Sequence, residues 1–143
     1  MKTNLYHLGA PCSIKKLEKF LLLNDAVSQE QYYDELCFGN YRVDYILESF
    51  NVNIERERGV WSISISDVNG DCFGINFLMC ILKEKEDYLA KKISLEEQVR
   101  FLQEKFVEIN ELLGAESLPK ILKKLHQLRE KLFAYQCPLW VFD

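Results

Sequence analysis

The chain has 143 residues, of which 48% are hydrophobic and 28% charged, a composition typical of a folded globular domain. The low content of glycine (six) and proline (three) argues against a fibrous or disordered chain. The net charge of −4 argues against a general attraction to nucleic acid or to an anionic membrane. We expect residues 1–143 to form a single globular domain.

The cysteines predict a reducing environment. The five of them, at positions 12, 37, 72, 80 and 137, are odd in number, and no pair has CxxC spacing. This pattern favours reduced, mostly buried thiols over a disulfide framework. Residues 1–10 lack the apolar core of a secretory signal, and the longest apolar run, 75–82, is too short to cross a bilayer. A cytoplasmic protein without a membrane segment is expected.

The first third of the sequence predicts mainly helices. Ser13 can cap a helix that places Leu17 and other apolar residues on one side and ends near Asn24. Ser28 and Gln31 form a capping box for a second helix, 28–37.

Residues 41–50 fit two structures. Every second residue from Tyr41 to Leu47 is apolar, as in a strand, whereas Val43, Leu47 and Phe50 fit one face of a helix. Because Asn40 can cap a helix, the helix is slightly preferred.

The middle third predicts a three-stranded antiparallel β-meander. Residues 51–55 and 61–66 alternate between apolar and polar side chains, and Arg58-Gly59 separates them. Asn69-Gly70 then offers the residues of a tight hairpin turn, in which both central positions require positive φ. Every second residue from Phe73 to Ile81 is apolar, which predicts the third strand.

The last third predicts two helices. Ser94 and Glu97 form a capping box for a helix that ends at Gly114, and a second helix begins near Ser117. The short connection predicts antiparallel packing. The apolar tail 137–142 is expected to pack back on the domain. The predicted fold is α+β, with N-terminal helices, the β-meander and a C-terminal antiparallel helical hairpin packed on the sheet.

The sequence offers no signature of a catalytic or metal site. The two histidines, His7 and His126, have no cysteine or second histidine at helical spacing, so we predict no metal ion and no cofactor. The motifs G-x-S-x-G, P-loop and G-x-G-x-x-G do not occur. An enzyme or a small-ligand protein would need a site of scattered residues, with His7, Cys12, His126 and nearby carboxylates as candidates.

The acids and tyrosines of the first third suggest a surface for a basic protein partner. Aromatic side chains supply interface anchors, and charges steer encounter. The candidate binding residues are Asp25, Glu30, Tyr32, Tyr33, Asp34, Glu35, Tyr41, Asp44, Tyr45 and Glu48. The competing interpretation is that these tyrosines belong to the core.

The two C-terminal helices carry opposite charge. Six acids and two bases lie between Ser94 and Glu116, whereas 118–134 holds five bases and one acid. The simpler interpretation is a set of ion pairs between the two helices. The alternative is a phosphate-contacting stripe of Lys120, Lys123, Lys124 and Lys131. We favour the first, because neighbouring acids would weaken the field and no aromatic stacking platform is evident.

These observations favour a binding role over an enzymatic one. A small, acidic α+β chain without catalytic motifs is similar in general character to toxin-neutralising immunity proteins, a similarity of type that rests on no motif. The leading hypothesis is a non-enzymatic inhibitor or immunity-type protein that masks a basic partner surface. The alternatives are a scattered-site enzyme or ligand-binding protein, and a nucleic-acid-binding or regulatory module that uses the basic helix. Each is compatible with a homodimer.

Overall fold

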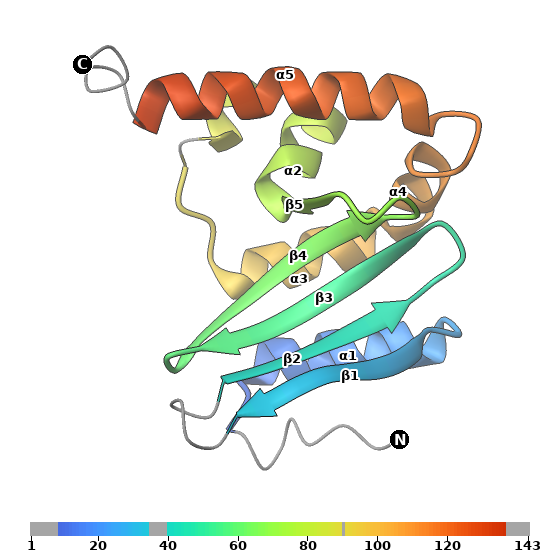
Figure 1. Cartoon of the computed structure of the whole chain (residues 1–143), viewed down its shortest axis with the longest axis vertical. Helices are drawn as coiled ribbons and strands as arrows, with labels where there is room; N and C mark the ends of the chain where they lie inside the picture. The colour runs from blue at the N-terminus through green and yellow to red at the C-terminus, as the bar shows by residue number, and fades with distance from the viewer. Residues whose placement is uncertain (1–8, 35–39, 90, 137–143) are drawn as a thin grey trace.

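The computed structural model describes residues 9–34, 40–89 and 91–136 and has the predicted α+β class (Figure 1). In chain order the elements are α1 (Cys12–Leu23), β1 (Val27–Asp34), β2 (Asn40–Ile46), β3 (Phe50–Glu57), β4 (Val60–Asp67), β5 (Cys72–Gly74), α2 (Ile75–Lys83), the 3-10 helix η1 (Glu86–Leu89), α3 (Leu95–Glu104), α4 (Phe106–Leu112) and α5 (Leu118–Gln136).

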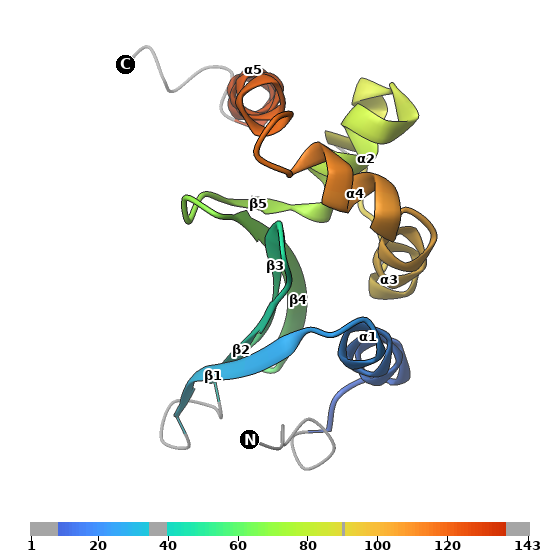
Figure 2. The same ribbon diagram turned by 90° about the vertical axis from the view of Figure 1, so that its right-hand side faces the viewer.

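The strands form one antiparallel sheet in the order β1-β2-β3-β4-β5, so each strand pairs with its neighbours in the sequence. Helices α1, α2, α3 and α4 lie on one side of this sheet, and α5 lies beyond its β5 edge (Figure 2). The sheet is curved, and its hollow side faces away from these helices (Figure 2). One face of the sheet therefore supports the core, and no described helix covers the other.

The predicted helix 28–37 and the preference for a helix over 41–50 are wrong. Residues 27–34 form β1, which pairs with β2 from Val27 opposite Ile46 to Asp34 opposite Asn40, with a bulge between Glu30 and Tyr32. Residues 40–46 form β2, whose alternate residues from Tyr41 to Tyr45 are buried. The gain from pairing β1 with β2 and β2 with β3 outweighs the local capping signals, because pairing satisfies backbone groups along the strands.

The two predicted turns are present, but the geometry of the turn at Asn69-Gly70 differs from the prediction. Arg58 and Gly59, which join β3 to β4, have φ values of 51° and 81°, as a two-residue hairpin with positive φ at both positions requires. At Asn69-Gly70 only Gly70 has positive φ, at 88°. The connection from β4 to β5 is a four-residue loop, 68–71, closed by a hydrogen bond from the Asp67 N–H to the Asp71 carbonyl at 3.0 Å.

The predicted third strand of the meander is wrong beyond residue 74. β5 ends at Gly74, and α2 continues from Ile75 to Lys83. Ile75 and residues 77–80 are all buried, so this helix is apolar on most of its surface. A short, continuously apolar segment does not show by periodicity whether it is a buried strand or a buried helix.

The two C-terminal helical segments exist, but they do not form the predicted hairpin. Lys105, with φ −107° and ψ 14°, divides the first segment into α3 and α4. The Ser94 cap is confirmed, since its Oγ accepts the Glu97 N–H at 3.2 Å. α3 packs against α1, whereas α5 packs against α2 and η1. The opposite charges of α3 and α5 therefore do not pair these helices. The predicted packing of 137–142 lies outside the described residues.

The hydrophobic core lies between the sheet and the helices. It joins Ile14, Leu17 and Leu21 of α1 to the buried faces of β2, β3 and β4 and to α2, α3 and α5. Phe106 of α4 connects two layers, with ring centroids 5.2 Å from Phe20 and 5.9 Å from Phe50. In the described part of the chain, no helix is long and apolar enough to span a membrane.

Candidate functional site

The tyrosines predicted to contact a partner lie partly in the core. Tyr41 and Tyr45 are on the helix side of the sheet, with exposed fractions of 1% and 0%. The Tyr45 hydroxyl donates a hydrogen bond to the Glu18 carboxylate of α1, so this tyrosine fastens α1 to β2. The two residues support the fold, as the competing interpretation held, and are not accessible to a partner.

The predicted acids do not form a single surface. Asp25 and Glu48 are exposed at the end of the sheet where Val27 pairs with Ile46. Glu30 is half-buried in β1, and its Oε2 has no hydrogen-bond partner among the described residues. Asp44 lies on the opposite face of the sheet from Tyr45, its neighbour in sequence.

For the remaining predicted partner residues, the structure describes at most which strand they belong to. Tyr32, Tyr33 and Asp34 belong to β1, and Glu35 lies outside the described residues.

The residues proposed for a scattered catalytic site are not brought together. Cys12 begins α1 and His126 lies in α5, and these helices are at opposite ends of the molecule in both views (Figures 1 and 2). His7 lies outside the described residues. In the described ranges, no group of three or more histidine, cysteine or acidic residues is placed to hold a metal ion.

The surface that stands out is the uncovered side of the sheet, which we call the open face. It consists of the residues of β2–β5 that alternate with the core residues: Arg42, Asp44, Ile46, Asn51, Asn53, Glu55, Glu57, Val60, Ser62, Ser64, Ser66 and Cys72. An antiparallel sheet can leave one face in water, so an uncovered face alone does not indicate a function. Its hollow shape and an ordered polar network distinguish this one.

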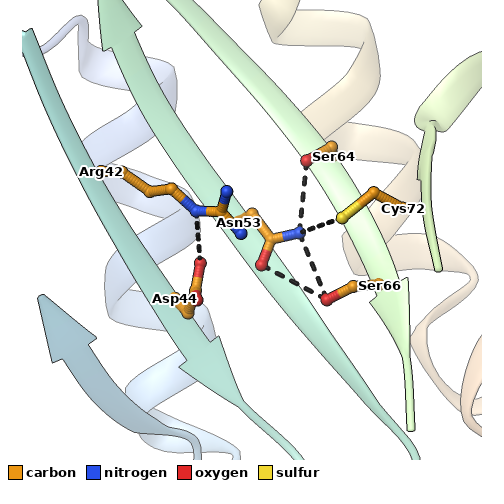
Figure 3. Close-up of polar contacts among 6 residues, drawn as sticks. All are labelled: Arg42, Asp44, Asn53, Ser64, Ser66 and Cys72. Atoms are coloured by element: carbon orange, nitrogen blue, oxygen red, sulfur yellow. Dashed lines mark hydrogen bonds and ion pairs between the residues drawn. The ribbon is translucent and has the colours of Figure 1, made fainter. Parts of the chain in front are cut away.

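Asn53 is the centre of the polar network (Figure 3). Its Nδ2 lies 3.3 Å from the Oγ atoms of both Ser64 and Ser66 and 3.9 Å from the Cys72 Sγ. The Ser66 hydroxyl in turn donates to the Asn53 Oδ1 at 3.4 Å. Asn53 is only 2% exposed, so its amide gains little from water and depends on these partners. The network fixes side chains from three neighbouring strands relative to one another.

A separate ion pair lies on the neighbouring strand β2. The Arg42 Nε donates to the Asp44 Oδ1 at 3.1 Å (Figure 3). Burial tends to lower the pKa of Arg42, but the hydrogen bond and charge of Asp44, with the charges of Cys72 and Glu55, raise it overall. Arg42 therefore remains charged and holds Asp44 in place, and the two charges nearly cancel.

The β5 edge of the open face is tied to α5. The Arg129 Nη2 donates to the Cys72 carbonyl at 2.8 Å. The preceding loop is held by Asp67, whose Oδ1 accepts the N–H groups of Asn69 at 2.8 Å and Asp71 at 3.1 Å. These contacts position Cys72, an exposed free cysteine, beside Asn53.

The described residues also line several grooves. One of about 420 Å³ lies between α1 and α3 and includes Cys12 and Arg100. Another of about 440 Å³ includes Trp61 of β4, Lys92 and Gln98. A third of about 270 Å³ lies between α2 and α5.

The chain matches no protein-family model, no curated protein and no solved structure. The function of the open face must therefore be argued from its own geometry.

Sequence reasoning located the strands β3 and β4 but missed the site that they carry. The signal was the polar half of the alternation, Asn53 and the serines 62, 64 and 66. Alternation predicts that such residues face water. It does not predict that an asparagine will bond to serines on the next strand, because that depends on register.

Replacing Asn53 by alanine is expected to lower the free energy of unfolding by about 1–2 kcal/mol, because the buried hydroxyl of Ser66 loses its partner. Chemical denaturation measures the change. Asn51→Ala is the matched control, since Asn51 is on the same strand and face but is more exposed. Equal losses in both variants would show that the network does not stabilise the face.

Proposed function

We propose that this protein is a non-enzymatic binding module that covers a basic surface of another protein with its open face, as an inhibitor or immunity-type protein does. The observation that carries the proposal is the hollow, uncovered sheet face with side chains already fixed by the Asn53 network. A hollow face can receive a convex surface, and the network, whose Asn53 and Ser66 are themselves buried, holds β3 and β4 in a fixed arrangement beneath that surface, so little entropy is lost when a partner binds.

The charges of the open face support a basic partner. The three acids Asp44, Glu55 and Glu57 outnumber the one base, Arg42, among the charged residues of the open face, so their summed charge is negative. Glu55 is half-buried and Glu57 exposed, on the strand that also carries Asn53. Negative charge at this position attracts a positive patch during encounter and repels an acidic protein.

The proposed mechanism is steric. A partner seated on β3 and β4 would have its own basic site covered, with no chemical step on either protein. The exposed acids Asp25 and Glu48 at one end of the sheet extend the negative charge beyond the open face. The core residues Tyr41 and Tyr45 act only indirectly, by holding the sheet against α1.

The double substitution Glu55→Lys and Glu57→Lys is expected to weaken partner binding roughly 10- to 100-fold, because it places positive charge opposite a positive patch. Tagged wild-type and variant proteins would be incubated with lysate of the source organism, and bound proteins quantified by mass spectrometry. The result that supports the proposal is a basic protein retained stoichiometrically by the wild type, released by salt and lost from the variant.

The matched control is Glu104→Lys with Glu111→Lys. These exposed acids belong to α3 and α4, on the other side of the sheet, and their reversal changes the net charge by the same amount. A partner lost equally from both variants would respond to net charge alone. A partner retained by the open-face variant would bind elsewhere, and either result contradicts the proposal.

A further inference from the structure

The basic residues of α5 form a line on its outer surface. Lys120, Lys124, Gln127 and Lys131 are separated by four, three and four residues, so they share one side of the helix. All four are exposed, whereas Ile121, Leu125 and Leu128 form the buried side. At 1.5 Å per residue the line is about 16 Å long. We call these four residues the α5 stripe.

A groove runs beside the stripe, between α5 and the end of α2. It has a volume of about 270 Å³, and three lysines line it, Lys85, Lys124 and Lys131. Glu84 is the one acid among its lining residues, and Cys80 and Leu128 are apolar lining residues that are buried. Lys85, in the connection between α2 and η1, thus lines the groove opposite the stripe, so lysines lie on both sides of the groove.

The acids of α3 do not lie against this surface. The acidic helix α3 packs against α1 and not against α5. No ion pair is recorded for Lys120, Lys123 or Lys124 in the described part of the chain. The packing therefore removes the reason for treating the basic residues of α5 as internal partners of α3.

The chemistry of the surface indicates what it binds. Protein interfaces rely on apolar and aromatic anchors. The exposed large hydrophobic residues of the described chain lie at positions 22, 23, 27, 46, 60, 68 and 107, and none belongs to α2 or α5. No aromatic residue is among the described residues that line the groove, so these residues offer unpaired bases no stacking surface. A surface that has lysines but neither apolar anchors nor aromatic stacking surfaces is suited to the phosphate groups of a base-paired duplex.

We infer that the α5 stripe and Lys85 bind the phosphate backbone of double-stranded nucleic acid, without reading its sequence. This surface is separate from the open face and does not depend on the proposed protein partner. The net charge of −4 makes the orientation of binding important, since the α5 stripe has to face the polyanion.

The test is fluorescence anisotropy with a labelled 24-base-pair duplex of arbitrary sequence, measured from low to moderate salt. Three to four lysine–phosphate contacts predict a slope of log affinity against log salt of about −3. The variant Lys120→Gln with Lys124→Gln is expected to bind at least about tenfold more weakly at low salt and to reduce the slope by about two. A second duplex of different sequence should bind equally well.

The control is Lys16→Gln with Lys19→Gln, two exposed lysines of α1 at the other end of the molecule. It should bind the duplex like the wild type. The inference is overturned if the control loses as much affinity as the α5 variant, if wild-type binding is absent or independent of salt, or if poly-glutamate competes as well as an unlabelled duplex. Both variants should keep any partner of the open face, so failure here is distinguishable from failure of the proposed function.

Discussion

Replacement of Phe50 by alanine is expected to lower the free energy of unfolding by about 3–5 kcal/mol, the usual cost of deleting a buried phenyl ring. Phe50 begins β3 and is 1% exposed. Its ring lies 5.9 Å from that of Phe106, which in turn lies 5.2 Å from Phe20. Its loss therefore leaves a cavity beside Phe106 and removes the ring contact between β3 and α4.

Urea denaturation followed by circular dichroism would measure this change. Val60→Ala is the control, because Val60 lies on the neighbouring strand and is exposed, and its effect should stay within about 0.5 kcal/mol. A loss below about 1 kcal/mol for Phe50→Ala would contradict the packing of the three rings.

Replacement of Asp67 by alanine is expected to cost about 2–3 kcal/mol, because the hairpin loses two hydrogen bonds to a charged acceptor. Asp67 is 3% exposed at the end of β4, and its Oδ1 holds the N–H groups of Asn69 and Asp71. Its other oxygen, Oδ2, is buried without a hydrogen-bond partner in the described part of the chain, which offsets some of the gain.

Comparing the thermal unfolding of Asp67→Ala with that of Asp71→Ala distinguishes the contributions of the two carboxylates to stability. The exposed Asp71 should tolerate the change, since it contributes backbone groups to the loop. Amide exchange at residues 69–72 should also accelerate in Asp67→Ala. If both variants are equally stable, the Asp67 carboxylate does not hold the hairpin.

The elements that were predicted correctly are determined by residues close together in the sequence. β3 and β4 alternate clearly, and Gly59 permits the turn between them. α5 has Pro119 in its first turn and a regular apolar line, and Ser94 caps α3. In each case the residues that decide the structure are within a few positions of one another, so one sequence suffices.

The predicted secondary structure is wrong where contacts between residues far apart in the sequence determine the structure. Residues 27–34 contain a helix-capping pattern, yet they pair with β2 as a strand. The apolar segment after Gly74 fits either a buried strand or a buried helix until its neighbours are known. The helix is interrupted at Lys105 although no glycine or proline, the usual helix-breaking residues, occurs there.

The candidate site was missed for a related reason. Tyr41 and Tyr45 were grouped with Asp44 by their proximity in sequence, but a strand sends neighbours to opposite faces. The assignment of residues 41–50 as a helix concealed this separation. The cluster around Asn53 depends on the register of three strands, which no local pattern specifies.

The attachment of α5 has a consequence for how the protein opens. α5 rests mainly on α2 and η1, and Arg129 bonds it to the Cys72 carbonyl of the short strand β5. The hydrogen-bond ladders among β1, β2, β3 and β4 include none of its residues. We therefore expect α5 to detach as a cooperative unit while these strands keep their register. The free energy of opening measured by amide hydrogen exchange should then be low for α5 and highest for the central strands.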